Sequence, residues 1–455
     1  MNEVKKTAIF GLVAIVMVAL AFVFSPRKIT PEAFADQGQP FFPDFTDPNK
    51  ATTLEVVDFD ESTGEAHPFK VTFKNGKWTI PSHYDYPADG KDRLAKTAAG
   101  VIGIKKDEFR SDNVSDHEAL GVIDPMDQSA SLKGRGQRVT IKGENDQVLA
   151  DLIIGKPVEG RDGFRYVRLP DQNRVYASKI DLDISTKFDD WIDRDLLHLT
   201  KDNIERVELK DYSIDEQTYS IRNRDDLIMT KADNNKWTAN RLSSGQKLDS
   251  AKVDSLLKAI TEVQIVGVRP KPEGLSATLK ETGDKKQITE EDVRSLQSKG
   301  FYFSRQGQLL SNDGELQVGG SDGVVYTLRF GEVVYGSGLA VTAGTPDSAS
   351  DSDRGKEAEN RYLFITTDFD PSYIGKEPPK PTDMKFQGKP DSTRTDQDRK
   401  NQDLYSKHSR WQVRVDAGKK TARELSDRFA DWYYVISADS YNKIHKERTQ
   451  LLAKK

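Results

Sequence analysis

The chain contains no cysteine among its 455 residues. It therefore forms no disulfide, and it offers no thiol nucleophile, no thiolate ligand for a metal and no cysteine to carry a lipoprotein-type lipid anchor. This absence is compatible with an oxidising and with a reducing compartment. It excludes cysteine chemistry without placing the protein in the cell.

Histidine is scarce as well, with six in the chain. No two histidines stand three or four residues apart, which is the spacing that puts two metal ligands on one face of a helix. The six are His67, His83, His117, His198, His408 and His445. We therefore predict no metal site, and nothing in the sequence indicates a cofactor site.

Two glycine motifs that mark nucleotide and catalytic sites are also missing. Without a glycine-rich phosphate loop, the chain is not expected to be the energy-coupling subunit of a transporter. It has no Gly-x-Ser-x-Gly motif, and the nearest match, at Ser337, lacks the strand–turn–helix context of a nucleophile. We predict no catalytic residue, although a glycosidase-like pair of dispersed carboxylates stays an open alternative.

Two acidic segments could be mistaken for calcium loops. They are Ser321-Asp322-Gly323 and the run from Asp347 to Asp353. Neither has the alternating oxygen ligands and the closing glutamate of such a loop. We interpret both as flexible acidic loops.

The charge balance gives no sign of a basic field. Lys and Arg total 68 and Asp and Glu total 73, so the net charge is −5. Nucleic acid is therefore not an expected partner. With 36% hydrophobic and 31% charged residues, the chain can form two or three domains with highly charged surfaces.

One long apolar run is present, from Thr7 to Phe24, and it carries no charge. As a helix it would span about 27 Å, which matches the core of a bilayer. We predict an uncleaved single-pass anchor in the cell membrane within residues 1–28, with the bulk of the chain extracytoplasmic. A signal peptide cleaved near Ala33-Phe34-Ala35 is the alternative.

A proline-rich stalk is expected over residues 29–51, docked to the following domain by Phe41, Phe42 and Phe45. The segment Asn75-Gly76-Lys77-Trp78-Thr79 then returns as Asn234-Asn235-Lys236-Trp237-Thr238.

A helical face follows each Trp at the same offset, with Asp89 expected to cap the first helix. The matched positions are Leu94 with Val253, Ala98 with Leu257, Val101 with Ile260 and Ile104 with Val263. We therefore predict an α+β fold of two tandem repeats, each an antiparallel sheet with a helix, over residues 52–200 and 201–375. In the second copy, Val207 to Leu209 and Tyr219 to Ile221 are the strands expected before Trp237. Both Trp side chains are interpreted as core.

The last strand of the second repeat is expected late, at Tyr434 to Ser437, within a final segment 432–455 that also holds a C-terminal helix. An insertion at 376–431 causes this delay. It begins with a proline-rich linker and continues, over 391–431, as a long helical arm with coiled-coil character. Its thin apolar stripe suits packing either on the domain or on a partner. A solvated arm with only its C-terminal turns packed is the alternative. The stripe consists of Leu404, Trp411, Leu425, Phe429 and Trp432.

The soluble part resembles the membrane-anchored family called domain of unknown function 4340. The likeness rests on Trp78, the turn from Leu120 to Pro125, the strand end at Gly155 and Tyr166-Val167. It covers residues 52–200 well and the second half in part. The resemblance implies an accessory role outside the membrane in ABC-type export systems related to those of gliding motility, and no catalytic residue.

Two hypotheses for function follow. The first is a non-catalytic accessory or interaction protein, held in the lipid bilayer by residues 7–24, with membrane transport subunits as partners. The second is an envelope enzyme, such as a glycan hydrolase whose carboxylates lie far apart in the sequence. The oligomeric state is left open.

Overall fold

The structure is a computed structural model. It describes residues 11–18, 20, 36–182, 184–215, 218, 220–232, 235–280, 288–304, 306–336, 338–344 and 359–454. Contacts divide the chain into two units. One comprises Met1–Lys70 and Lys91–Ile184, and the other comprises Val71–Gly90 and Ser185–Lys455.

Half of the predicted anchor, Thr7 to Phe24, lies outside the described residues. Residues 11–18 are helical, and their large apolar side chains are exposed, with Leu12 at 66% and Ile15 at 72%. Across the described ranges, every helix falls short of the length or the apolarity that crossing a bilayer requires.

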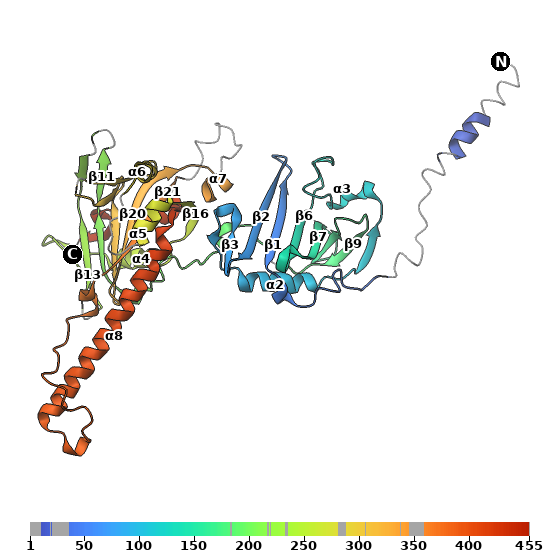
Figure 1. Cartoon of the computed structure of the whole chain (residues 1–455). Helices are drawn as coiled ribbons and strands as arrows, with labels where there is room; N and C mark the ends of the chain where they lie inside the picture. Colours follow the sequence, from blue (N-terminus) through green and yellow to red (C-terminus); the bar gives the residue numbers. More distant parts are fainter. Residues whose placement is uncertain are drawn as a thin grey trace. The chain divides into compact units, whose positions relative to one another are not determined.

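The first sheet has nine strands in the order β4-β3-β2-β1-β6-β7-β8-β9-β5 (Figure 1). The pairings that involve β3 to β9 are antiparallel, as is that of β1 with β6. The strands are β1 Thr53–Asp60, β2 Glu65–Lys74, β3 Lys77–Ile80, β4 Tyr86–Pro87, β5 Glu108–Ser111, β6 Gln137–Lys142, β7 Val148–Pro157, β8 Phe164–Arg168 and β9 Val175–Lys179.

Local chemistry explains how this sheet begins. Asn75 and Gly76 both have positive φ, 53° and 77°, which is the backbone of the tight turn that joins β2 to β3. Helix α2, Lys91–Ile102, buries Leu94, Ala98 and Val101 at helical spacing, as the sequence predicts.

The expected N-cap at Asp89 is wrong. The helix starts at Lys91, so Gly90 precedes it, and the Asp89 N–H donates to the carbonyl of Trp191.

The second sheet has eight antiparallel strands in the order β14-β13-β10-β19-β20-β21-β22-β16. Helix α4, Ser250–Thr261, buries Val253, Leu257 and Ile260 and is capped by the Asp249 carboxylate. The strands are β10 Ile204–Lys210, β13 Leu227–Lys231, β14 Trp237–Ala239, β16 Ile265–Pro270, β19 Glu315–Gly320, β20 Val324–Val334, β21 Asn360–Phe369 and β22 Trp432–Ile436.

One strand of the second sheet was assigned wrongly from the sequence. Residues 220–223 form β12, Ser220–Asn223, which pairs with β11, Tyr212–Asp215, in a separate hairpin. All four residues of β12 are exposed, whereas Leu227 and Met229 of β13 are fully buried. Because a strand inside a covered sheet must bury one face, β13 takes the place expected for residues 219–221. The late strand, by contrast, is confirmed, since β22 pairs with β21.

Smaller elements complete the chain. Two further hairpins pair β15, Gln246–Leu248, with β23, Leu452–Lys454, and β17, Phe301–Phe303, with β18, Leu309–Ser311. The short α-helices are α3 His117–Leu120, α5 Glu273–Lys280, α6 Glu290–Gln297, α7 Gly338–Thr342 and α9 Ala438–Ile444. The 3₁₀ turns are Pro48–Lys50, Pro81–His83, Val114–Asp116, Glu144–Asp146, Phe188–Asp190, Lys201–Asn203, Pro371–Ile374, Asp391–Thr393 and Arg448–Leu451.

The stalk docks on the first unit as predicted. Phe41 and Phe45 are 5% and 2% exposed, and the Phe41 ring meets Tyr176 edge-on at 5.4 Å. The Tyr176 hydroxyl donates to the Asp36 carboxylate, and Lys106 Nζ lies 3.2 Å from that carboxylate. These contacts fix the end of the stalk from residue 36 onward.

The arm is helix α8, Asp396–Ala430, whose 35 residues correspond to about 52 Å. It begins at a capping box in which Thr395 and Asp398 satisfy each other's backbone N–H groups. Its C-terminal half packs on the second sheet, and its N-terminal half extends past the sheet (Figure 1). The side chains buried in the packed half are Val415, Ala422, Leu425, Phe429 and Ala430.

This packing differs from the predicted coiled coil. Along its packed half, α8 contacts strands β20 and β21 and the short helix α5. A strand surface cannot supply the matching heptads of a partner helix, and α5 has only eight residues. Around the projecting half, Trp411 Nε1 donates to the carbonyl of Gly375 at 3.0 Å, which ties the helix to its own linker.

We predict that Gly418→Val loosens the arm. A Cβ at Gly418 would lie 2.1 Å from the carbonyl oxygen of Asp322, so the helix backbone must move away from the sheet. We expect a loss of about 1–3 kcal/mol in unfolding free energy, measured by chemical denaturation. Ala417→Val adds the same side chain on the exposed side and should cost less than about 0.5 kcal/mol beyond helix propensity. Equal effects would contradict this account of the docking.

Candidate functional site

The turn from Leu120 to Pro125 is the first candidate site. Helix α3 ends at Leu120, and Gly121 follows in the left-handed conformation with φ 71°. The backbone of β7 approaches this turn so closely that a Cβ at Gly155 would lie 2.5 Å from the Leu120 carbonyl oxygen. The glycines of the motif are therefore required by packing.

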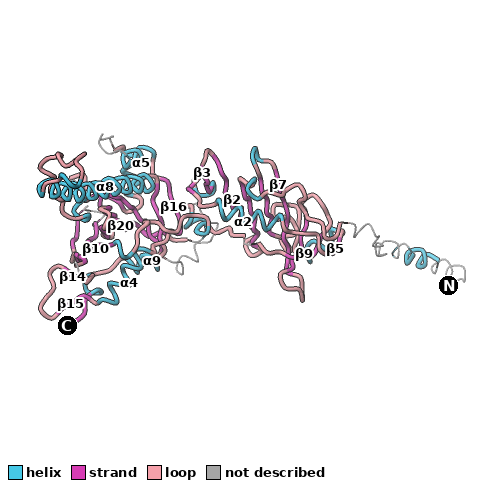
Figure 2. The backbone as a smooth tube through the Cα atoms, turned by 90° about the horizontal axis from the view of Figure 1, so that it is seen from below, coloured by secondary structure: helices cyan, strands magenta, loops and turns pink. Residues whose placement is uncertain are grey.

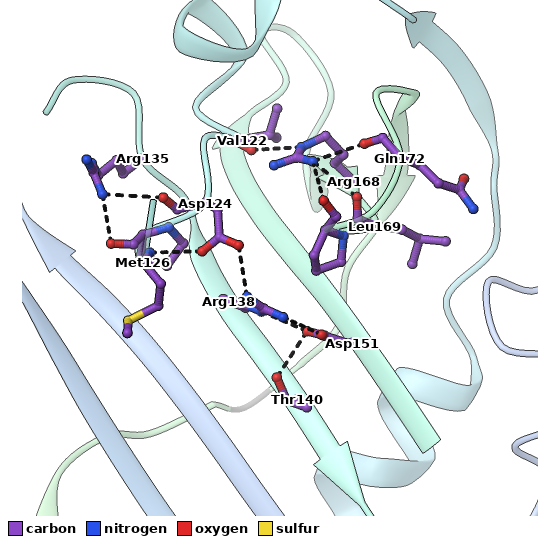
Figure 3. Close-up of polar contacts among 12 residues, drawn as sticks. Val122, Asp124, Met126, Arg135, Arg138, Thr140, Asp151, Arg168, Leu169 and Gln172 are labelled. Atoms are coloured by element: carbon purple, nitrogen blue, oxygen red, sulfur yellow. Dashed lines mark hydrogen bonds and ion pairs between the residues drawn. The ribbon is translucent and has the colours of Figure 1, made fainter. Parts of the chain in front are cut away.

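Arg168 binds the turn through the Val122 carbonyl (Figure 3). Its side chain is 7% exposed, and its Nε donates to the Val122 carbonyl at 3.0 Å. Its Nη1 donates to the carbonyls of Leu169, Pro170 and Gln172 at 3.0–3.2 Å. Burial lowers the pKa of Arg168 from its usual value, and the four carbonyl groups compensate for the lost hydration.

Two more arginines complete this network. Arg138 donates to the Asp151 carboxylate at 2.6 Å and to the Asp124 carboxylate at 2.9 Å, and the hydrogen bond to Asp151 raises the pKa of Arg138. Arg135 donates to the carbonyls of Pro125 and Asp127. These groups are occupied with one another, so they stabilise the conformation of the loop.

The six histidines lie in different surroundings. His67 and His198 are exposed, His408 lies beside Glu377, and His445 stacks on Tyr441. The Nε2 atom of His117 lies 2.8 Å from the Asn173 carbonyl oxygen. His83 is 2% exposed and stacks on Phe188 at 4.3 Å. Among the described residues, no group of three or more His, Asp or Glu side chains is arranged to hold a metal ion.

The structure describes one of the three loop segments that resemble a catalytic or calcium-binding motif. Ser337 and the run from Asp347 to Asp353 lie outside the described residues. Ser321-Asp322-Gly323 forms the turn between β19 and β20, where the Asp322 carboxylate accepts the N–H of Val324 at 3.1 Å. The Asp322 side chain therefore serves the turn.

A groove beside Trp237 is the second candidate site. It has a volume of about 1050 Å³ and lies between β14, β15 and the first turns of α4. Figure 2 shows these three elements together near the C-terminus. Its lining includes four lysines, Lys201, Lys231, Lys236 and Lys247, and two aspartates, Asp202 and Asp254.

The interpretation of both Trp side chains as core is wrong. Trp78 and Trp237 are each half-buried, and Trp237 lines the groove. Trp78 packs on Phe73, with ring centroids 5.3 Å apart, whereas the residue opposite Trp237 is Lys231. The partner of the Trp is thus Phe73 in the first sheet and Lys231 in the second. This difference is the signal in the sequence that could have indicated the groove.

Comparison with known families identifies the central part of the chain. Residues 78–280 match the model of the family described as Domain of unknown function (DUF4340). This part of the chain belongs to the DUF4340 family. The match starts at Trp78, passes through Trp237 and ends in α5, so it covers most of the first predicted repeat and part of the second. No curated protein and no solved structure matches the chain.

We predict that Arg168→Met destabilises the first unit. The substitution keeps the aliphatic stem but leaves four carbonyls without their donor, which should cost about 2–4 kcal/mol of unfolding free energy. Arg161→Met is the matched control, because that guanidinium is exposed and pairs with Glu108. It should cost less than about 1 kcal/mol. A similar cost for both variants, in urea unfolding, would show that the turn does not depend on Arg168.

We also predict a pH dependence from His83. Burial, aided by the charge of Arg269, lowers the pKa of His83 from 6.5 to about 4. Between these values the unfolded chain binds the proton and the folded chain does not, so stability falls as the pH drops from 7 to 4. The loss should be about 3 kcal/mol.

Urea unfolding at a series of pH values measures this loss. His83→Phe keeps a ring on Phe188 and removes the titrating group, so its stability should fall less than that of the wild type below pH 6.5. Above pH 7, where His83 is neutral in both the folded and the unfolded chain, the difference in unfolding free energy between the two proteins should not change with pH. Parallel curves between pH 7 and pH 4 would refute the role of His83.

Proposed function

We propose that this DUF4340 protein is a membrane-anchored, extracytoplasmic interaction protein without catalytic activity, which serves a membrane transport system of the ABC type as an accessory component. Helix α8 carries the proposal. The C-terminal half of this helix packs on the sheet, and among the described residues the contacts of the other half are with its own linker. The residues buried there, such as Asn401 of the helix and Phe386 of the linker, add nothing to the core of the sheet, so the outer surface of the projecting half is available to a partner.

The surface of the projecting half supports contact with a protein. Val413 is 68% exposed and Tyr405 is 40% exposed on the helix, and Met384 is 40% exposed on the linker. Around them the helix is densely charged, with ion pairs such as Lys407 with Asp403. Apolar side chains within a charged rim are typical of a modest protein interface.

The strand orders support a duplicated module as the body of the protein. The two orders coincide when strands are matched in chain sequence, except that β4 has no counterpart in the second sheet. The matches are β1 with β10, β2 with β13, β3 with β14, β5 with β16, β6 with β19, β7 with β20, β8 with β21 and β9 with β22. Two rigid copies joined in one chain would form a scaffold that carries the arm.

The apolar run from Thr7 to Phe24 supports the membrane anchor. It has no charged side chain, and its described residues 11–18 are helical with exposed apolar side chains. Exposed leucine and isoleucine at this density are unfavourable in water and favourable in lipid. The proposed topology places the tail inside and the two sheets outside the cell membrane.

We predict that shortening the arm weakens partner binding without unfolding the protein. Because Trp411 contacts Gly375, residues 376–410 can be replaced by a short Gly–Ser linker. Deleting all of 376–430 would remove the buried residues Leu425 and Phe429 and is therefore expected to affect folding. The shorter deletion should keep the melting temperature within a few degrees, since loss of the helix cap costs only about 1 kcal/mol.

The measurement is affinity purification of the full chain from mild detergent, with quantification of transport subunits. The wild type should recover an ATPase or permease subunit, and the shortened variant should recover severalfold less. Tyr405→Ser combined with Val413→Ser keeps the helix and should change recovery in the same direction. Recovery of no transport subunit by the wild type would refute the accessory role, and hydrolysis of an envelope glycan by the purified protein would support an enzyme instead.

A further inference from the structure

The outer edge of the strand that carries each Trp differs between the two halves of the proposed duplication. In the first sheet, β4 pairs with β3 and closes this edge: Tyr86 lies opposite Ile80, and Pro87 lies opposite Thr79. The Ala88 N–H also donates to the Trp78 carbonyl at 2.9 Å. The edge beside Trp78 is therefore occupied by an extended segment of the same chain.

In the second sheet the corresponding segment does not pair with the strand that carries the Trp. At the offset that relates Trp78 to Trp237, β4 corresponds to residues 245–246, which lead into β15, Gln246–Leu248. Strand β15 instead pairs with β23 at the C-terminus, where Lys247 lies opposite Ala453. Strand β14 is left as the edge of its sheet, and its residues Trp237 to Ala239 line the groove.

The backbone of β14 presents hydrogen-bonding groups to this groove. The N–H of Asn240 donates to the Ile228 carbonyl on the inner side. Residues of an antiparallel strand alternate between the two neighbours, so Ala239 and Trp237 turn their N–H and C=O groups to the outer side. Within the described ranges, these outward groups make no backbone hydrogen bond.

The side chains around the edge favour acidic partners. Four lysines and two aspartates line the groove. Lys201 pairs with Asp254, and Lys231 Nζ donates to the Asp202 carbonyl at 2.8 Å. Lys247 is exposed on β15 on the opposite side of the groove from β14. Lys231 Nζ also lies 3.5 Å from the Glu205 carboxylate, so four lysines stand against three carboxylates and leave a net charge of 4 − 3 = +1. This charge attracts carboxylates, and the half-buried Trp237 ring offers an apolar surface beside the lysines.

We infer that this groove binds an extended, acidic peptide segment of a partner protein, which adds to β14 as a further strand. The outward groups of Trp237 and Ala239 supply the main-chain hydrogen bonds, and the lysines select acidic side chains at alternate positions. In the first sheet, β4 is the example of an occupant, since it is an extended segment of this same chain at the matching edge. The proposal goes beyond the role of the arm and does not depend on it, because replacing residues 376–410 leaves every lining residue in place.

Ala239→Pro gives the sharpest test. The change removes an N–H that points outward and keeps every hydrogen bond to β13, and proline is tolerated on an edge strand. Lys247→Glu reverses a charge of the groove. Lys258→Glu is the matched control, since it makes the same charge change on α4 at a position outside the lining.

The measurement is fluorescence anisotropy with the full chain in detergent and labelled peptides of about eight residues. The acidic probe alternates Glu with Thr, and the basic probe alternates Lys with Thr. The wild type should bind the acidic probe at least about tenfold more tightly than the basic one, and binding should weaken with added salt. Ala239→Pro should lose about tenfold in affinity with an unchanged melting temperature, and Lys247→Glu should lose more than Lys258→Glu.

Three results would overturn the proposal. The first is equal affinity of the wild type for the two probes or no binding of the acidic one. The second is undiminished binding by a folded Ala239→Pro variant, which would mean that the peptide does not add as a strand. The third is binding of an oligosaccharide of uronic acids that survives Ala239→Pro and is lost in Trp237→Ala, which would assign the groove to a glycan. Loss of transport subunits in the arm variant with peptide binding intact would separate this proposal from the accessory role.

Discussion

The satisfaction of strand edges is the constraint on which this architecture depends. An antiparallel sheet leaves N–H and C=O groups along both outer strands, and each edge must be paired, covered or left to water. In the first sheet, β4 fills the edge beside Trp78 with two residues of regular pairing. In the second sheet, β15 pairs with β23 instead of with β14, so the edge beside Trp237 has no paired strand among the described residues. The pairing of this one segment therefore decides whether the edge beside the Trp is covered, as in the first sheet, or bordered by a groove, as in the second.

The same constraint explains how a long insertion is tolerated. The chain leaves the second sheet after β21 and returns as β22, which pairs with β21 on one side and with β16 on the other. Both backbone edges of the returning strand are thus satisfied, whatever length of chain lies between. The cost of closing a loop rises only slowly with its length, so the insertion could grow into a helix of 35 residues without disturbing the sheet.

Sequence patterns predicted the elements that have strict periodicity. The apolar face of Val253, Leu257 and Ile260 returns at the spacing of the first helix, and the delayed strand at Tyr434 is present because its residues alternate into a buried sheet. Patterns did not predict which of two neighbouring strands joins the second sheet. Residues 220–223 and 227–231 both form strands, and the burial of Leu227 and Met229 places the second of them in the sheet. The groove at Trp237 was missed for a related reason, since the loss of a neighbouring strand leaves no mark on the residues of β14 itself.

A buried lysine shows how the arm is joined to the sheet. Lys271 follows β16, its side chain is 6% exposed, and its Nζ donates to the carbonyl of Phe429 at 2.8 Å in the last turn of α8. The rings of Phe364 and Tyr433 lie 3.9 Å and 5.5 Å from the same nitrogen, and burial lowers the pKa of Lys271 well below its usual value. A cation is favoured at the C-terminus of a helix and over aromatic rings, and those contacts offset part of the cost of desolvation. Because the Lys271 N–H also donates to the carbonyl of Asp431, the end of the helix and the edge of the sheet are held by both backbone and side chain. A partner that pulled on the projecting half of α8 would therefore act on β16 and β22 directly, with no flexible joint between the arm and the sheet.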